Sequence, residues 1–317
     1  MGRTLLFSAF NRPPDKLNKR SCQPMLSTMP YQKQTATIDG KQIAYVDEGE
    51  GDPIVLLHGN PTSSFLWRKV IPELTGSGRV IAPDLIGQGD SAKLPASVGP
   101  DRYGFMTAYH YLDGLLQALE LGDRITLVIH DWGSALGFYW AHQHPERIRG
   151  IAYMEAIVMP VDWQDWPEGA RGIFQGFRSD KGESLIIDRN MFVEAVLPGS
   201  VMRTLTEEEM NEYRRPFPEP EDRRVTLSWP REIPIGGEPP EMVRLVDEYG
   251  EWLASPDSPP KLFINADPGS ILVGRQREFC RSWPHQAEIT VTGTHFIQED
   301  SPVDIGTAVA EWLRYLG

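Results

Sequence analysis

Short runs rich in apolar residues, separated by helical patterns, are the feature that most limits the fold of this chain. Six of them resemble strands covered on both faces, at residues 54–57, 79–82, 125–129, 150–154, 261–265 and 288–291. Such runs are typical of parallel sheets buried between two layers of helices. Two further strands, 35–38 and 42–46, flank Asp39-Gly40, which is a hairpin turn signal. The alternation predicts an α/β fold with a mostly parallel eight-stranded sheet and helices on both faces.

Helical patterns fill the intervals between these strands. Apolar residues recur at three- and four-residue steps from Met106 to Leu119, and Gly122 is expected to end that helix. We expect a second helix over residues 134–142, directly after the strand 125–129. An amphipathic helix from Ile305 to Leu316 is expected to close the chain.

The alternation stops between about residues 158 and 258. Aromatic residues and prolines cluster there, and the segments have helical patterns without convincing strands. The aromatic side chains include Trp163, Trp166, Phe174, Phe177, Phe192, Phe217 and Trp229. An insertion of this kind between two sheet strands is typical of a lid over an active site. We therefore expect a core of residues 31–157 and 259–317 and a helical cap of residues 158–258.

The acidic composition argues against several kinds of partner. The 317 residues carry a formal net charge of −13, which disfavours binding to nucleic acid or to anionic membranes. No apolar run approaches the roughly 20 residues of a membrane span. Two cysteines, Cys22 and Cys280, provide neither a disulfide framework nor a zinc motif. We expect a cytoplasmic protein without a metal, as a monomer or weak homo-oligomer.

Residues 1–30 differ in composition from the rest of the chain. They hold five basic residues against a single acid, Asp15. Their one apolar patch is too short for the hydrophobic part of a secretory signal. A transit peptide is the alternative, but the segment has few serines. We expect a disordered basic tail, with Met25 or Met29 as a candidate initiator.

A tight turn between a predicted strand and a predicted helix carries the candidate nucleophile. The strand 125–129 runs into His130-Asp131-Trp132-Gly133, and a helix follows. Nucleophile turns of this kind need small flanking residues because the backbone is strained. Gly133 meets that need on one side, whereas Ile129 does not meet it on the other. The alternative is that Asp131 only caps the helix; we interpret it as a nucleophile.

An aspartate nucleophile limits the reaction that follows. A carboxylate needs no base to activate it, and it attacks carbon by displacement to give an ester. The helix N-terminus behind it favours the ionised form. Its targets are therefore electrophilic sp³ carbons, such as those of alkyl halides or epoxides, rather than esters or amides.

A histidine and an acid follow other strands of the predicted sheet. His295 comes just after the last strand, which is the chain position of the histidine in triads of the order nucleophile, acid, histidine. We expect it to act as general base on the water that hydrolyses the ester. Glu155 and Asp267, each directly after a strand, are both placed to orient His295. Spacing alone does not choose between them.

The loop His58-Gly59-Asn60-Pro61 follows the third predicted strand. In this fold class such a loop supplies an oxyanion-hole N–H, paired with the N–H of Trp132. The Asn60 amide and the Trp132 indole would also present two side-chain donors beside Asp131. Two neutral donors suit a halide leaving group; the alternative is that Asn60 only shapes the turn. No dinucleotide motif and no P-loop is present, so we expect no cofactor.

With these residues identified, the chain resembles the haloalkane dehalogenases of the α/β-hydrolase superfamily over nearly all of residues 31–317. The shared stretches are HGNPTSSFLWR, PDLIGQGDS, HDWGSALGFYWA, MEAIVMP, TLSWPREIP, NADPG and GTHFIQEDSP. The likeness is strongest to the subgroup that contains the bacterial hexachlorocyclohexane-pathway dehalogenase. It implies an α/β-hydrolase fold with a helical cap. It also implies a small halogenated hydrocarbon as substrate, hydrolysed with water to an alcohol, a halide ion and a proton.

The resemblance also implies roles for individual residues. They are the nucleophile Asp131, the base His295, the acid Glu155, and the halide-binding Asn60 and Trp132. Asp267 occupies the position that other subgroups use for the acid. The substrate pocket that the resemblance implies is lined by Trp166, Phe174, Phe192, Trp229, Pro230 and Ile271.

Three other functions share parts of this pattern. An epoxide hydrolase also has an aspartate nucleophile but needs two cap tyrosines, and the insertion holds Tyr213 and Tyr249. That family usually has an aromatic residue where this chain has Asn60. Coelenterazine luciferases share the HGN and HDWG stretches, the glutamate and the histidine. A ligand-sensing protein with a silent triad is the third alternative, and it is disfavoured because no member of the triad is missing.

Overall fold

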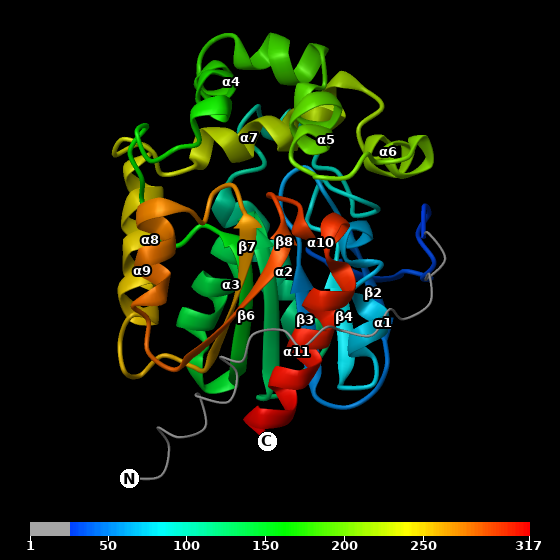
Figure 1. Cartoon of the computed structure of the whole chain (residues 1–317). Coiled ribbons are helices and arrows are strands. Elements are labelled where there is room, and N and C mark those ends of the chain that lie inside the picture. Colours follow the sequence, from blue (N-terminus) through cyan, green and yellow to red (C-terminus); the bar gives the residue numbers. More distant parts are fainter. Residues whose placement is uncertain (1–25) are drawn as a thin grey trace.

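The computed structural model describes residues 26–317, so the predictions for residues 1–25, Cys22 included, lie outside the described part. The described chain forms one eight-stranded sheet (Figure 1). Its strands are β1 (Gln34–Ile38), β2 (Lys41–Glu48), β3 (Pro53–Leu57), β4 (Arg79–Pro83), β5 (Ile125–Asp131), β6 (Ile148–Ala156), β7 (Lys261–Pro268) and β8 (Gln286–Gly293). The strand order is β1-β2-β4-β3-β5-β6-β7-β8, antiparallel at β1–β2 and β2–β4 and parallel elsewhere. The predicted α/β fold is confirmed.

Local sequence explains the two kinds of strand pairing. β3 is buried at all five positions, as a central parallel strand should be. The β1–β2 hairpin turns at Asp39 and Gly40, whose φ angles are +45° and +74°. Two consecutive residues with positive φ match the right-handed twist of a two-residue hairpin, and Asp-Gly is a preferred pair for it. The turn predicted from these two residues is present.

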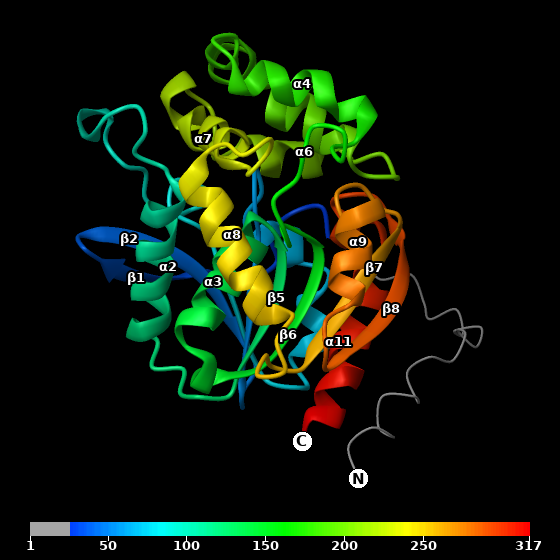
Figure 2. The same ribbon diagram turned by 90° about the vertical axis from the view of Figure 1, so that its left-hand side faces the viewer.

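Helices cover both faces of the sheet (Figures 1 and 2). On one face lie α2 (Phe105–Ala118), α3 (Trp132–Gln143) and α8 (Pro240–Leu253); on the other lie α1 (Ile71–Leu74) and α11 (Pro302–Leu316). The first layer buries Leu112 and Phe138, and the second buries Val309 and Trp312, each against the sheet. Two apolar layers on one sheet are the reason why its central strands lack polar faces.

The end of α2 differs from the prediction. The helix stops at Ala118, four residues before Gly122. Glu120 already adopts a left-handed φ of +48°, and its N–H donates to Gln117 O at 3.1 Å. The chain therefore reverses at Glu120, which lets the buried Leu121 reach the core. Gly122, with a φ of +73°, lies in the turn between α2 and β5.

Residues 157–260 contain helices and only isolated β-bridges. The helices are α4 (Glu168–Arg178), α5 (Leu197–Gly199), α6 (Glu207–Arg214), α7 (Arg224–Glu232) and α8, together with shorter 3₁₀ and π-helical turns. Figure 1 shows α4, α5, α6 and α7 above the carboxyl ends of the strands. α8 returns to the core, where Tyr249 packs on Phe138 of α3 with ring centroids 5.5 Å apart. The helical layer over the sheet therefore consists of α4 to α7.

Contacts with the core begin before residue 31, the predicted start of the core. Arg68 donates from Nε to Leu26 O at 2.5 Å, and Met29 packs against the core. No helix within residues 26–317 is long and apolar enough to cross a membrane.

Candidate active site

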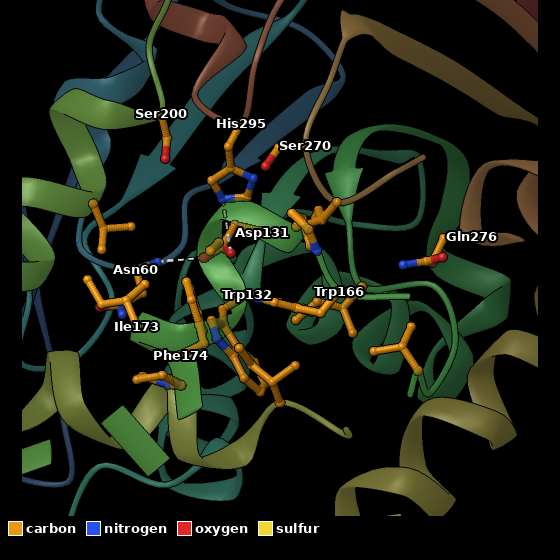
Figure 3. Close-up of a pocket in the computed structure, with 18 of the residues that line it drawn as sticks. Asn60, Asp131, Trp132, Trp166, Ile173, Phe174, Ser200, Ser270, Gln276 and His295 are labelled. Atoms are coloured by element: carbon orange, nitrogen blue, oxygen red, sulfur yellow. Dashed lines mark hydrogen bonds and ion pairs between the residues drawn. The ribbon is translucent and has the colours of Figure 1, made fainter. Parts of the chain in front are cut away.

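A cavity of about 490 Å³ lies between the carboxyl ends of the strands and the helical layer above them, since residues of both line it. Asn60, Asp131, Trp132 and His295 form its floor (Figure 3). Its wall is mainly apolar and includes Trp166, Phe174, Phe192, Pro230 and Ile271. A cavity with a few polar groups converging at one end is typical of a small-molecule site.

Asp131 stands where β5 turns into α3, with φ +51° and ψ −130°. Two glycines make room for this strained turn. A Cβ on Gly133 would lie 2.4 Å from the carbonyl oxygens of Leu57 and His58, and a Cβ on Gly59 would lie 2.0 Å from Asp131 Oδ1. A side chain at Gly133 would require the backbone to move, and one at Gly59 would displace the Asp131 carboxylate. The turn therefore holds the Asp131 carboxylate against β3 and the loop that follows it.

The two carboxylate oxygens of Asp131 have different surroundings. Oδ1 accepts from the backbone N–H of Asn60 at 2.7 Å, while Oδ2 lies 3.3 Å from Nε2 of His295. Burial by itself would raise the pKa of Asp131. The hydrogen bond from His295 and that from the Trp132 backbone N–H outweigh burial and hold the pKa of Asp131 below its usual value. These contacts favour the ionised form of the carboxylate.

His295 follows β8 and connects two carboxylates. Its Nδ1 lies 3.4 Å from Oε2 of Glu155, on the side of the ring opposite to Asp131. Burial alone lowers the pKa of His295, but the contacts with Asp131 and Glu155 outweigh burial and raise the pKa to about 9. His130 supports the arrangement from behind, since its Nε2 bonds to the His295 carbonyl oxygen at 2.8 Å.

Glu155 is held by three backbone N–H groups. Oε2 accepts from Ser270 at 3.0 Å and from Ile271 at 2.8 Å, and Oε1 accepts from Leu272 at 3.4 Å. The Glu155 side chain is fully buried, whereas Asp267 lies exposed at the end of β7. Among residues 26–317, the carboxylates within ion-pair distance of His295 are those of Asp131 and Glu155. The structure therefore brings Glu155, and not Asp267, to the histidine.

Asn60 and Trp132 both line the floor of the cavity beside Asp131. The Asn60 side chain donates from Nδ2 to Thr226 O of α7 at 3.2 Å. Trp229 does not line the cavity, contrary to the expectation for it. Trp229 packs behind Trp132, with the two ring centroids 4.8 Å apart. The adjacent Pro230 does line the cavity, and neighbouring residues on a helix point in different directions, so Trp229 points away from the cavity.

Three polar residues of the cavity wall were missed at the sequence level. Ser200 and Ser270 lie beside His295, and Gln276 lies farther from the Asp131 carboxylate (Figure 3). Ser200 is beside the catalytic floor because its carbonyl accepts from the N–H of Phe296 at 3.0 Å. Ser200 follows α5, Ser270 comes after β7, and Gln276 lies within α9 (Gly274–Arg281), so no shared local pattern marks them.

The arrangement of a nucleophile turn, a histidine after the last strand and an acid at the carboxyl end of β6 defines an α/β hydrolase. The profile of the family described as the alpha/beta hydrolase fold matches residues 52–302. A haloalkane dehalogenase of Sphingobium indicum is 57% identical over 294 residues, covering 92% of this chain and 98% of that protein. A haloalkane dehalogenase of Mycolicibacterium smegmatis is 53% identical, covering 92% of this chain and 94% of that protein. The chain therefore belongs to the haloalkane dehalogenases.

Solved structures agree with this assignment. The haloalkane dehalogenase DbeA from Bradyrhizobium elkani has a TM-score of 0.85 and 40% identity, covering 90% of this chain and 98% of that one. The haloalkane dehalogenase DatA from Agrobacterium tumefaciens also has a TM-score of 0.85, with 32% identity over 93% of this chain. The fold is thus shared along almost the whole described chain.

Proposed function

We propose that this chain hydrolyses haloalkanes to an alcohol, a halide ion and a proton through a covalent ester on Asp131. One observation carries the proposal: the ionised Asp131 carboxylate contacts His295 on one side, and two donor side chains, Asn60 and Trp132, stand beside it in an apolar cavity. A halogenated hydrocarbon needs apolar walls along its chain and hydrogen-bond donors at the departing halide. Both requirements are met at opposite ends of one cavity.

In the first step Asp131 Oδ2 displaces the halide from an sp³ carbon. Oδ2 is the attacking atom because Oδ1 is already bonded to the Asn60 N–H. The carbon–oxygen bond forms as the carbon–halogen bond breaks, and the halide leaves with both bonding electrons. The second N–H of the Asn60 amide and the indole N–H of Trp132 stabilise the charge that develops on the halide.

In the second step His295 takes a proton from water, whose oxygen adds to Cγ of the ester. The negative charge that forms on Oδ1 is stabilised by the backbone N–H groups of Asn60 and Trp132. The bond between Cγ and Oδ2 then breaks, and protonated His295 gives its proton to the departing oxygen to form the alcohol. The Asp131 carboxylic acid loses its own proton to solvent, which restores the carboxylate and accounts for the proton among the products. Glu155 keeps the His295 ring in place and stabilises its protonated form.

The epoxide hydrolase alternative requires phenol O–H groups in the cavity. Tyr213 instead donates to Glu299 at 2.5 Å, and Tyr249 donates to Ile157 O at 2.6 Å. Neither tyrosine is among the residues that line the cavity. These two observations favour the dehalogenase over an epoxide hydrolase.

We infer that the division into a core and a helical cap is functional, with the cap closing the cavity over the substrate. We also infer that the enzyme works in the cytoplasm as a monomer or weak homo-oligomer.

Release of halide from 1-bromobutane is the test of this function. We expect bromide release by the wild-type chain and none by Asp131→Ala. Turnover of styrene oxide without halide release would favour an epoxide hydrolase. Light emission with coelenterazine and no bromide release would favour the luciferase chemistry.

A further inference from the structure

One turn of α7 contacts both side chains that we assign to the halide. Thr226 O accepts from Asn60 Nδ2 at 3.2 Å. Trp229 packs against Trp132 with ring centroids 4.8 Å apart and an interplanar angle of 35°. The segment from Thr226 to Pro230 thus links the cap helix to the leaving-group end of the cavity.

The Thr226 carbonyl is free to accept from Asn60 because of a proline. In an α-helix the carbonyl of residue i accepts from the N–H of residue i+4. For Thr226 that residue is Pro230, which lies inside α7 and has no N–H. The Asn60 amide therefore supplies the hydrogen bond that the helix itself cannot make.

This bond also fixes which way the Asn60 amide faces. With the amide turned over, Oδ1 would face the Thr226 carbonyl oxygen, and two acceptors repel each other. Oδ1 itself is buried without a hydrogen-bond partner among residues 26–317, so it does not hold the amide. Because one N–H of the Asn60 amide donates to the Thr226 carbonyl oxygen, the second N–H of that amide can donate toward the cavity.

Other contacts keep this part of α7 in place. Arg178 of α4 donates from Nη1 to the carbonyl oxygens of Pro230 at 2.9 Å and Ile233 at 2.7 Å. The Glu232 carboxylate accepts from the N–H of Phe105 at 2.7 Å, at the start of α2. The helix is thereby held to the cap at one point and to the core at another, which keeps the Thr226 carbonyl at a fixed place above Asn60.

We propose that Pro230 is a positioning residue for carbon–halogen cleavage: by lacking an N–H it frees the Thr226 carbonyl, which orients the Asn60 amide toward the leaving halide. The inference rests on the proposed function, because it assumes that Asn60 donates to the halide. It predicts that the missing N–H of Pro230, and not the shape of its ring, sets the orientation.

The test compares two replacements that differ at one backbone atom. Pro230→Ala restores an N–H that competes for the Thr226 carbonyl. A second variant carries lactic acid, the α-hydroxy acid counterpart of alanine, at position 230; it has the alanine side chain but no N–H. Pro234→Ala is the control: it removes a proline from the same cavity wall, but this proline lies outside a helix. Replacing a proline inside a helix by alanine favours the helix, so Pro230→Ala should fold.

The readouts are the first-turnover rates with 1-chlorobutane and 1-iodobutane, and the inhibition constant for bromide. Loss of one transition-state donor costs roughly 10²–10³-fold in rate. For a misdirected donor we expect Pro230→Ala to slow chloride cleavage by about 10-fold or more, to slow iodide cleavage less, and to weaken bromide inhibition. The lactic acid variant should keep the wild-type ratio of chloride to iodide rates. Pro234→Ala should shift KM and keep that ratio.

Two outcomes would overturn the inference, and Asn60→Ala separates them from a failure of the proposed function. If Asn60→Ala slows chloride cleavage but Pro230→Ala leaves the chloride-to-iodide ratio unchanged, Pro230 does not act through Asn60. If the lactic acid variant changes the ratio as much as Pro230→Ala does, the proline ring and not the absent N–H is responsible. If Asn60→Ala itself leaves chloride cleavage unchanged, the leaving-group role in the proposed function is wrong.

Discussion

Nε2 of His295 lies 3.3 Å from Oδ2 of Asp131, the oxygen that we expect to carry the alkyl group. The histidine therefore contacts the nucleophile before the reaction and stands beside the ester after it. Alkylation turns the Asp131 carboxylate into a neutral ester, so His295 loses one of the two charges that raise its pKa to about 9. The pKa of His295 should fall in the alkyl-enzyme, which favours the neutral base that the second step needs.

The Asp131–His295 contact predicts a dependence of stability on pH. The folded-state pKa of His295, about 9, lies above its ordinary value of 6.5. Its contribution to the free energy of unfolding is therefore fully present below pH 6.5 and is lost as the pH rises through 9. In Asp131→Asn that loss should be smaller by about 1 kcal/mol or more. Urea unfolding of both proteins at pH 6.5 and 9 measures it, and an identical change in both would contradict the assignment.

Glu155 and Asp267 provide a matched pair of variants. Glu155→Gln removes the charge that stabilises protonated His295, so we expect ester hydrolysis to slow by on the order of 10²-fold. Asp267→Asn changes an exposed carboxylate and should leave turnover near that of the wild type. Steady-state bromide release measures both variants. A larger loss in Asp267→Asn than in Glu155→Gln would assign the orienting role to Asp267.

A buried ion network joins α6 of the cap to the core. Arg68 donates to Glu299 at 2.5 Å and to Glu209 at 2.7 Å, and all three side chains are almost fully buried. Breaking a buried pair by removing one partner costs about 3–5 kcal/mol. Lys69 and Arg203 also pair with both carboxylates, so neither is left without a partner. We therefore expect Arg68→Met to cost less than that, about 1–3 kcal/mol of the free energy of unfolding.

The matched control for the network is an exposed ion pair. Arg124 and Asp52 lie 2.8 Å apart at the surface. Arg124→Met should cost less than about 1 kcal/mol, because exposed pairs are weak. Chemical denaturation of both variants makes the comparison. Equal losses in Arg68→Met and Arg124→Met would mean that the buried network does not stabilise the contact between cap and core.

Gln276 predicts a preference among substrates. Its amide is buried in the cavity wall, and its contact with Asp165 O is long at 3.4 Å. A hydroxyl at the far end of a substrate would give the amide a better partner, worth about 0.5–1.5 kcal/mol. Gln276→Leu should therefore raise kcat/KM for 1-bromobutane relative to 4-bromobutanol by roughly 2- to 10-fold. An unchanged ratio would show that Gln276 does not contact the substrate.

Most of the fold was predictable because strand and helix periods differ clearly in the core. Asp131 and His295 could be chosen because the carboxyl ends of parallel strands meet at one edge of the sheet. Glu155 could not be separated from Asp267 by spacing, since each stands at the carboxyl end of a strand. A bulge between β5 and β6 distinguishes them. His130 pairs with Met154 and Asp131 pairs with Ala156. Glu155 is therefore the extra residue of the bulge, and its φ is +40°.

The cap was less predictable for a different reason. Its helices pack on one another and on the core, so the direction of each side chain depends on helix phase. Trp229 and Pro230 are neighbours, yet only Pro230 lines the cavity. The hydrogen bond from Asn60 to Thr226 joins residues far apart in the chain, and no local pattern marks it.

The covalent ester on Asp131 is the central claim, and intact-protein mass spectrometry of a His295→Phe variant tests it most directly. Without the base, attack by Asp131 should still occur while hydrolysis of the ester stops. After incubation with 1-bromobutane we predict a mass increase of one butyl group, located on Asp131 by peptide mapping. An unmodified His295→Phe chain, under conditions in which the wild type consumes 1-bromobutane, would contradict the mechanism.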